Sequence, residues 1–256
     1  MGANASTAVP LYASGQVLDA ARLNLTNCGV PVFSGTATRD AAFGSSGEKV
    51  LAEGQLCYLE DSNSVLYYDS AAWQSVGVTP GLVMVTATST ANTGGTVTTS
   101  GGRVTVAGSS SVSLNGVFTS TYHNYLILVD TVEVAAGANK LNLRLRASGT
   151  DTTTSTYYAG QIYGTYAGAS GGEANNGVAQ FPLSNLQTTK RQMFKIEVFS
   201  PQAATITTIH SLGVAFDAQS NYAGYQDGAT QYDGFTLFMS ASNFSGNITV
   251  YAYQKS

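Results

Sequence analysis

The sequence predicts an all-β protein, in which a jelly-roll-like β-sandwich follows a small N-terminal module with a β-hairpin and a short helix. The first observation is a series of short Thr- and Val-rich segments after residue 82, separated by Gly or Ser turns. The second is strict alternation of apolar and polar residues over Lys140–Ala147, and the third is the lack of any long helical period beyond residue 82. Many short strands with such turns are typical of a sandwich or jelly roll rather than of a sheet with crossover helices.

Composition limits the kinds of protein that this chain can be. Charged residues make up only 10% of the 256 residues, against roughly 25% in average globular chains. Hydrophobic residues, at 43%, are sufficient for a packed core. Low charge with many β-branched and aromatic residues suits sheets that pack against other protein, and it disfavours a freely soluble metabolic enzyme.

The charge balance disfavours a nucleic-acid partner. The net charge is −4, and Lys190-Arg191 is the only pair of adjacent basic residues, whereas phosphate binding needs clustered Lys and Arg. No run of about eighteen apolar residues is present, so we expect no insertion into a membrane. The first fifteen residues lack the basic and apolar regions of a secretory signal.

Residues 56–76 predict a β-hairpin followed by a third short strand. Two apolar runs, Leu56–Leu59 and Val65–Tyr68, flank the polar tetrapeptide Asp61–Ser64. Asp and Asn tolerate turn dihedral angles and hydrogen-bond their own backbone, which favours a turn at this point. A second turn at Asp69–Ala71 leads to Trp73, the only tryptophan of the chain.

Two short helices are expected before the hairpin. Ser14 can cap a helix from Gln16 to about Asn24, along which apolar residues recur at helical spacing. A brief helical turn begins at Thr38 and is stopped by Gly44. The pattern breaks at Val78–Gly81, so we expect the chain to divide into residues 1–80 and 81–256.

Nine or ten strands are expected after that boundary. Lys140–Ala147 places three leucines on one face and Asn142, Arg144 and Arg146 on the other, which is typical of a strand with one buried and one wet face. Polar or Gly-rich composition predicts loops at residues 148–156, 167–177 and 221–233. The expected strands are Leu82–Thr88, Gly94–Thr99, Arg103–Ala107, Val112–Phe118, Asn124–Val134, Lys140–Ala147, Gln192–Phe199, Thr205–Phe216, Gly234–Ala241 and Asn247–Tyr253, and the aromatic segment Tyr157–Tyr166 is an alternative candidate.

The titratable residues do not form a recognisable catalytic or metal-binding motif. Neither His123 nor His210 has a second His or a Cys at ligand spacing, although a catalytic triad assembled in space is not readable from sequence order. The adjacent Glu60-Asp61 suits a turn, and Asp130 and Glu133 fall on opposite faces of a strand. We therefore expect no enzyme activity, no metal and no cofactor.

The two cysteines predict neither a metal cluster nor a disulfide framework. Cys28 and Cys57 both stand in apolar settings, where a reduced, buried thiol is the simplest interpretation.

Tyrosines are the candidate ligand-binding residues. Tyr222, Tyr225 and Tyr232 lie in the expected loop at residues 221–233, where exposed rings can stack on a sugar or anchor a protein partner. The alternative is that tyrosines fill sheet edges and the seams between subunits. In the N-terminal module, Tyr58, Tyr67, Tyr68 and Trp73 are expected to pack within the module rather than to bind a ligand.

The N-terminal region resembles the virion-anchoring modules of tailed-bacteriophage tail and fibre proteins. The order there is a short helix, an ATRDAA-like segment, a G-x-x-C/A-Y-L strand, a D-x-N turn and a Y-Y-D-G-x-x-W strand; here Ser70 stands where Gly is usual. The matching residues are Tyr12–Leu18, Ala20–Asn24, Ala37–Ala42, Gly54–Leu59, Tyr67–Asp69 and Ala72-Trp73.

The C-terminal region is similar to the jelly-roll modules at the ends of phage fibres and other appendages. The residues that carry this likeness are Ser113–Phe118, Tyr122–Leu128, Leu141–Arg146, Gly234–Phe238 and Gly246–Tyr251. The two resemblances together imply a structural protein on the virion surface, often a homotrimer, with residues 1–80 bound to other virion proteins of the tail, baseplate or capsid.

Three functions follow as hypotheses. The first is a tail fibre or fibre-tip protein that attaches to a glycan or protein of the host surface. The second is a capsid or tail decoration protein that stabilises the particle. The third, which composition and motifs favour least, is an enzyme that degrades surface polysaccharide, because the carboxylate pairs do not resemble those held across a sugar.

Overall fold

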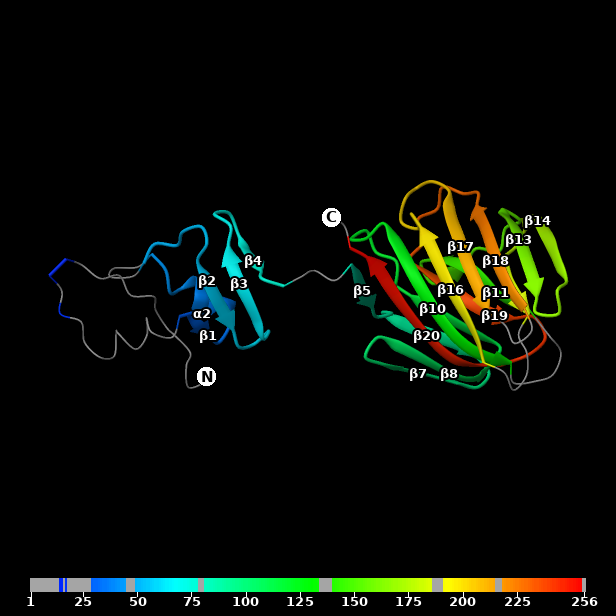
Figure 1. Cartoon of the computed structure of the whole chain (residues 1–256), viewed down its shortest axis with the longest axis horizontal. Helices are drawn as coiled ribbons and strands as arrows, with labels where there is room; N and C mark the ends of the chain where they lie inside the picture. Colours follow the sequence, from blue (N-terminus) through cyan, green and yellow to red (C-terminus); the bar gives the residue numbers. More distant parts are fainter. Residues whose placement is uncertain are drawn as a thin grey trace. The chain divides into compact units, whose positions relative to one another are not determined.

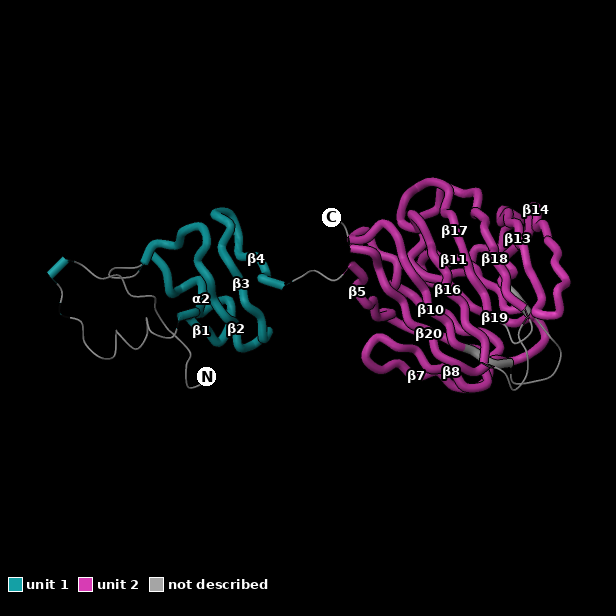
Figure 2. The backbone as a smooth tube through the Cα atoms, viewed as in Figure 1, with its two compact units in different colours: residues 1–79 teal, residues 80–256 magenta. Residues whose placement is uncertain are grey.

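The computed structural model describes residues 14–15, 17, 29–44, 49–77, 81–133, 140–185, 191–214 and 218–254. The fold is all-β, and the chain divides into two compact units, residues 1–79 and 80–256 (Figure 2). The helix expected from Gln16 to Asn24 lies outside the described residues, apart from Val17. Within the described residues, no helix has the length and apolar character needed to cross a membrane.

Unit 1 contains a four-stranded sheet in which the predicted hairpin forms the centre. The order is β1-β2-β3-β4, with β1 parallel to β2 and the other pairs antiparallel. Leu59 faces Ser64 across the hairpin, so the turn occupies residues 60–63 as expected. The strands are β1 (Val32–Phe33), β2 (Leu56–Leu59), β3 (Ser64–Tyr68) and β4 (Trp73–Ser75).

The two turns of this sheet are formed by the side chains that predicted them. Asn63 adopts a left-handed conformation, with φ of 49°, and its Oδ1 accepts a hydrogen bond from the Tyr58 hydroxyl at 2.9 Å. The Asp69 carboxylate accepts the backbone N–H groups of Ala71 and Ala72 at 2.9 and 2.7 Å. These bonds hold the pKa of Asp69 below its usual value and fix the turn that leads into β4.

A single turn of helix, α2 (Thr36–Asp40), joins β1 to the hairpin. It begins two residues before the expected start at Thr38, because the backbone N–H of Arg39 already bonds the carbonyl of Gly35 at 3.1 Å. The core of unit 1 is small, and Phe43, Leu66 and Trp73 pack around it. Its fully buried side chains are Phe33, Ala42, Cys57 and Leu59.

Unit 2 is a sandwich of two antiparallel sheets, so the predicted fold class is confirmed. In Figure 1 the ten-stranded sheet runs from β14 at one edge to β7 at the other, and β11 and β19 of the second sheet lie behind it. The order of the ten-stranded sheet is β14-β13-β18-β17-β16-β10-β20-β8-β7, and β5 also pairs with β20. The order of the six-stranded sheet is β12-β11-β19-β9-β6, and β15 also pairs with β11.

The strands of the ten-stranded sheet are β5 (Leu82–Val85), β7 (Thr96–Ser100), β8 (Arg103–Ser109), β10 (Asn124–Glu133), β13 (Tyr157–Thr165), β14 (Ser170–Val178), β16 (Gln192–Phe199), β17 (Thr207–Val214), β18 (Ala218–Gln226) and β20 (Phe244–Tyr253). Those of the six-stranded sheet are β6 (Ser89–Thr93), β9 (Ser111–Asn115), β11 (Lys140–Ala147), β12 (Thr150–Asp151), β15 (Phe181–Asn185) and β19 (Gly234–Met239).

The main core lies between the two sheets. Alternate residues of β10, β16 and β20 point toward alternate residues of β9, β11 and β19, and aromatic rings fill the space between them. The ring centres of Phe118 and Tyr125 lie 4.8 Å apart, and those of Phe118 and Phe235 lie 5.8 Å apart. Burial of this apolar surface is the dominant favourable contribution to folding.

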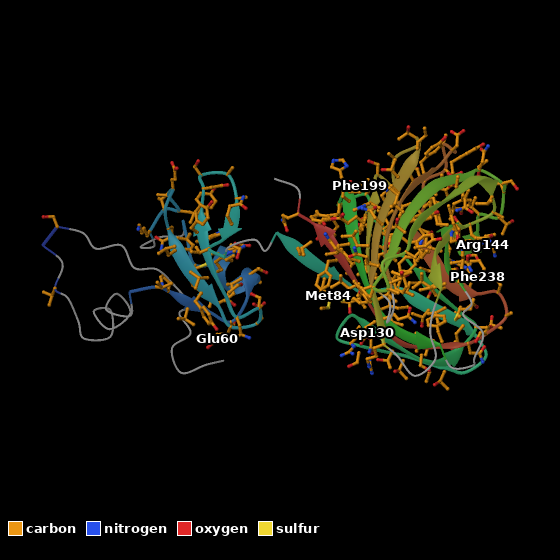
Figure 3. The ribbon with its side chains drawn as sticks, turned by 45° about the vertical axis from the view of Figure 1, so that its right-hand side comes forward. Glu60, Met84, Asp130, Arg144, Phe199 and Phe238 are labelled. Atoms are coloured by element: carbon orange, nitrogen blue, oxygen red, sulfur yellow. The ribbon has the colours of Figure 1, made fainter. Side chains whose placement is uncertain are left out.

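The strand β11 has the predicted bounds, but its polar face is less wet than expected. The three leucines are fully buried, and Asn142 on the opposite face is only 3% exposed. Arg146 donates hydrogen bonds to Ser113, Thr236 and Asp151. Arg144 lies over the ring of Phe238, with its guanidinium carbon 4.3 Å from the ring centre (Figure 3). Side chains of the neighbouring strands therefore partly cover the polar face of β11.

Two of the expected loops are strands. The Gly-rich segment 167–177 contains β14, which forms a hairpin with β13 through the pair Gly164 and Ser170. Part of segment 221–233 belongs to β18, which pairs with β13 on one side and β17 on the other. Cross-strand pairing outweighs the weak intrinsic strand propensity of these small and polar residues. A third loop, 148–156, contains the two-residue strand β12.

Candidate binding face

The outer face of the ten-stranded sheet, which points away from the six-stranded sheet, carries the candidate functional residues. Side chains alternate along each strand, so residues next to the buried Phe194, Ile196 and Val198 point outward. The register aligns outward side chains in rows that cross the strands. One row consists of Ile162, Asn221, Leu212, Lys195 and Leu128, each paired with the next.

A pair of stacked tyrosines lies in another row of this face. Tyr158 of β13 faces Tyr225 of β18, and their ring centres lie 5.1 Å apart at an interplanar angle of 17°. Tyr225 is 38% exposed, as the sequence predicted, but it lies on a strand rather than in a loop. Next to the pair along the strands, Gly160 and Ala223 are exposed and small. The pair is an aromatic surface that this face offers to a ligand.

The expectation that Tyr222 and Tyr232 are exposed is wrong. Tyr222 precedes Tyr225 by three residues on the same strand, so it points to the opposite side and is 1% exposed. Its ring packs edge-on against Phe181, with the centres 6.1 Å apart. Tyr232 is fully buried, and its backbone N–H donates to the carbonyl of Pro201 at 2.7 Å. Both tyrosines belong to the core between the sheets.

Glu197 is the centre of a polar cluster on the outer face. Its carboxylate accepts the Tyr253 hydroxyl at 2.7 Å and lies 3.3 Å from His210 Nδ1 and from Lys195 Nζ. The bond from Tyr253 is the main reason why the pKa of Glu197 is lowered. Burial and the same carboxylate raise the pKa of Tyr253 to about 12. The cluster therefore holds a charged carboxylate next to a neutral phenol at ordinary pH.

The geometry of the cluster does not favour catalysis. His210 Nε2 lies 3.1 Å from Asn221 Oδ1, so both ring nitrogens already have partners and neither is left to activate a nucleophile. His123 is exposed at the start of β10, and its backbone carbonyl accepts the N–H of Ser200. Among the described residues, no group of three or more His, Cys, Asp or Glu could hold a metal ion.

An apolar patch occupies the middle of the outer face, and sequence reasoning missed it. It consists of large aliphatic side chains that remain exposed: Ile162 (73%), Met193 (56%), Val214 (46%), Leu212 (42%) and Leu128 (37%). The sequence signal for the patch lay in Thr205–Phe216. Ile209 and Leu212 are three residues apart and so point to opposite faces of a strand, which predicts apolar side chains on both faces. A hollow of about 470 Å³ between Ile162, Leu212 and Val214 lies within the patch.

Of the four aromatic residues proposed for the N-terminal module, Tyr68 and Trp73 pack against each other. The rings of Tyr68 and Trp73 lie 5.6 Å apart, and the Arg39 guanidinium carbon lies 5.0 Å from the ring centre of Trp73. Tyr58 is partly buried and bonds Asn63, whereas Tyr67 is 39% exposed and points to the other side of β3. Tyr67 thus takes the least part in this packing.

Cys57 is an inert thiol in the core of unit 1. It is fully buried and free, and burial raises the pKa of its thiol to about 11. A thiol with so high a pKa is a poor nucleophile at neutral pH. Cys28 lies outside the described residues.

Comparison with known proteins does not assign this chain to a family. No protein-family model and no curated protein matches the sequence. Three solved structures show a distant likeness. They are the carbohydrate recognition domain of Emp47p (9% identity, 69% of this chain and 99% of that one, TM-score 0.28), that of Emp46p in its metal-free form (10%, 67% and 88%, 0.25) and a protein of unknown function from Shewanella oneidensis MR-1 (10%, 72% and 84%, 0.23). A likeness this weak does not bear on what the present chain binds.

Proposed function

We propose that this chain is a non-enzymatic structural protein of a tailed-phage virion, of the fibre or fibre-tip type, that attaches to the host surface as a homotrimer. The observation that carries the proposal is the packing of unit 1. The ATRDAA-like segment and the strand β4, which begins at Trp73, are far apart in the sequence, yet Arg39 and Trp73 are in contact. The resembling motifs that lie within residues 37–73 thus contribute to one small core, which fits an independent anchoring module.

Unit 2 would supply the contact with the host. Its outer face offers the stacked pair Tyr158–Tyr225 and the polar groups of the Glu197 cluster, which are the kinds of groups that bind sugars and protein surfaces. Three copies on one fibre act together, so modest affinity at each site is sufficient to hold a cell surface. The mechanism is adhesion, without a chemical step.

A decoration protein that stabilises the particle is the second candidate. The apolar patch favours it, because a contiguous apolar surface is suited to permanent contact with other protein. In that case the contacts of unit 2 with the particle, rather than with the host, would carry the function.

The deciding experiment uses virions of the phage that encodes the chain. Gold-labelled antibody against the protein should mark the tail fibres or baseplate, and particles without the protein should stay intact but fail to adsorb to cells. Label on the head, with normal adsorption and reduced particle stability, would establish the decoration role instead. Release of reducing sugar from host envelopes by the purified protein would contradict the absence of enzyme activity.

A further inference from the structure

We propose that the apolar patch on the outer face of the ten-stranded sheet is the contact through which copies of this chain associate. The patch contains five large aliphatic side chains, and Ile162 and Met193 are exposed by 73% and 56%. Single exposed aliphatic residues are ordinary on protein surfaces, but a contiguous group of them marks an interaction site. Whether these aliphatic side chains are contiguous depends on which strands are neighbours in the sheet.

The register of the strands makes Met193, Val214 and Leu212 immediate neighbours. Leu128 lies on the next strand beyond Met193, and Ile162 lies on the far side of Asn221 from Leu212. Met193 and Val214 are direct partners across β16 and β17. Leu212 precedes Val214 by two residues on β17, and Lys195 separates it from Leu128 of β10. The patch reaches across five neighbouring strands from β13 to β10, which is ~19 Å at the usual strand spacing. It occupies two adjacent rows, which lie about 7 Å apart along the strands.

The size of the patch fits the centre of a subunit interface. With side-chain width included, these dimensions give on the order of 300 Å² of surface, which the aliphatic side chains share with the polar residues between them. A standard interface covers about 800 Å² on each partner and has an apolar centre within a polar rim. Asp130 of β10, next to Met193, belongs to such a rim, whereas Asn221 and Gln219 lie within the patch and line its hollow.

The shape of the patch allows a projecting group of one copy to enter the hollow of the next copy. Between Ile162, Leu212 and Val214 lies the hollow of about 470 Å³, and Gly164 contributes no side chain to fill it. Met193, on the neighbouring strand, is more than half exposed. A methionine side chain is unbranched and adapts to irregular apolar spaces. One surface thus carries both a projecting apolar group and a hollow of similar character.

The charges around the patch favour a second copy over other partners. Lys195 Nζ lies 3.3 Å from Glu197 Oε1, and Arg191 lies 2.5 Å from Asp130, so the positive groups here are balanced within the chain. Two surfaces of equal net charge would repel each other, whereas a neutralised surface meets its copy without that cost. A patch for an anionic membrane would need surplus Lys and Arg, and one for a charged partner would keep an unbalanced sign.

The inference rests on the proposed function for its biological meaning, because the contact would be the seam between subunits of the fibre. The self-association itself is a property of the purified chain. If copies associate through the patch but the protein is absent from fibres, the proposed function fails and the inference stands. The Tyr158–Tyr225 pair lies outside the patch, four residues from Ile162 along β13.

Sedimentation equilibrium of the full chain tests the proposal. The unmodified chain should form a dimer or trimer at about 100 μM, a concentration at which even weak association is visible. Met193→Glu and Leu212→Glu should each raise the dissociation constant about tenfold or more, because each places a charge in the apolar centre. The matched control is Ile206→Glu, since Ile206 is 45% exposed but precedes β17 and lies outside the patch.

Thermal melts followed by circular dichroism show whether each variant is folded. Met193 is the more exposed of the two patch residues, so its variant is expected to keep the melting temperature of the unmodified chain. A chain that stays monomeric at the highest concentration would overturn the proposal. So would association that survives both patch substitutions, or that is weakened equally by Ile206→Glu.

Discussion

The guanidinium carbon of Arg39 lies 5.0 Å from the ring centre of Trp73, and this contact joins α2 to the last strand of unit 1. The same indole lies 5.9 Å from the ring of Phe43 and 5.6 Å from that of Tyr68. Arg39 is 8% exposed although it is charged, and its guanidinium also pairs with Asp40 at 2.7 Å. Trp73 is therefore the residue on which the helical turn and the hairpin converge.

Replacing Trp73 by Ala should destabilise unit 1 by about 2–4 kcal/mol, because it removes aromatic contacts and leaves the Arg39 charge without its ring. The thiol of Cys57 reports the loss, since it is fully buried in the same core. The rate at which Cys57 is alkylated, followed by mass spectrometry of its peptide, should rise in the variant. Tyr67→Ala is the control, because Tyr67 is 39% exposed. Equal labelling rates in both variants would contradict the role of Trp73.

Ser70→Gly should stabilise unit 1 by up to about 1 kcal/mol, because Gly adopts a left-handed conformation without the steric cost that Ser bears. Ser70 has φ of 75° in the turn before β4. The gain should appear as a higher denaturant midpoint for unit 1. Gly81, in unit 2, offers a control outside the module: its φ is not positive and a Cβ there meets open space, so Gly81→Ser should leave the midpoint of unit 1 unchanged. A loss of stability in Ser70→Gly would show that the serine hydroxyl matters more than the backbone.

The strongest sequence signals were those in which local chemistry and periodicity agree. The turns at Asn63 and Asp69, and the alternation of Lys140–Ala147 and Gln192–Phe199, gave element bounds that the structure confirms. The strands β14 and β18 were not predicted, because their inward residues include Gly171, Ser220 and Gly224. These small or polar residues remove the alternation of apolar and polar residues that marks a strand. Only pairing with β13 makes them strands, and pairing is not visible in a single segment.

The candidate site was harder to predict than the fold. Part of the expected loop is the strand β18, and side chains alternate between the two faces of a strand. Tyr222 therefore points inward and Tyr225 points outward. Tyr158 is the partner of Tyr225 through the β13–β18 register. This register joins residues far apart in the sequence, so no local sequence pattern predicts it. The apolar patch likewise depends on which strands are neighbours, so its members come from β13, β17, β16 and β10.

Arg146→Lys should cost about 3 kcal/mol or more, although the charge is kept, because one ammonium cannot replace a planar guanidinium with five donors. Arg146 Nε donates to Asn115 at 2.9 Å, and Nη1 donates to Ser113 at 3.0 Å, to Thr236 at 2.9 Å and to Asp151. Urea denaturation of unit 2 measures the change. The control is Arg103→Lys, because Arg103 is exposed at the start of β8. Similar midpoints for the two variants would contradict the structural role of the Arg146 network.

Tyr253→Phe should raise the pKa of Glu197, because the Tyr253 hydroxyl is the main group that lowers it. A carboxyl with a lowered pKa in the folded state stabilises that state above its unfolded pKa of about 4.3, and the contribution is lost as the pH falls through the folded pKa. The stability difference between the two proteins should thus be larger at neutral pH than below the folded pKa of Glu197. Urea midpoints across this range, with an NMR titration of Glu197, give the answer. A difference that does not change with pH would assign the effect to packing alone.

Tyr222→Phe should leave unit 2 as stable as before or stabilise it by about 1 kcal/mol, because a buried hydroxyl without a partner costs free energy that a phenyl ring does not. Tyr222 is 1% exposed, and its hydroxyl has no hydrogen-bond partner among the described residues. The matched control is Tyr157, which is equally buried but donates to the Thr152 carbonyl at 2.9 Å and accepts the N–H of Leu145 at 3.2 Å. Tyr157→Phe should therefore cost about 1–3 kcal/mol, since it leaves two backbone groups without that partner. Denaturant midpoints of the two variants make the comparison. If Tyr222→Phe is as costly as Tyr157→Phe, the Tyr222 hydroxyl is bonded in solution, and an ordered water inside the sandwich is the group that satisfies it.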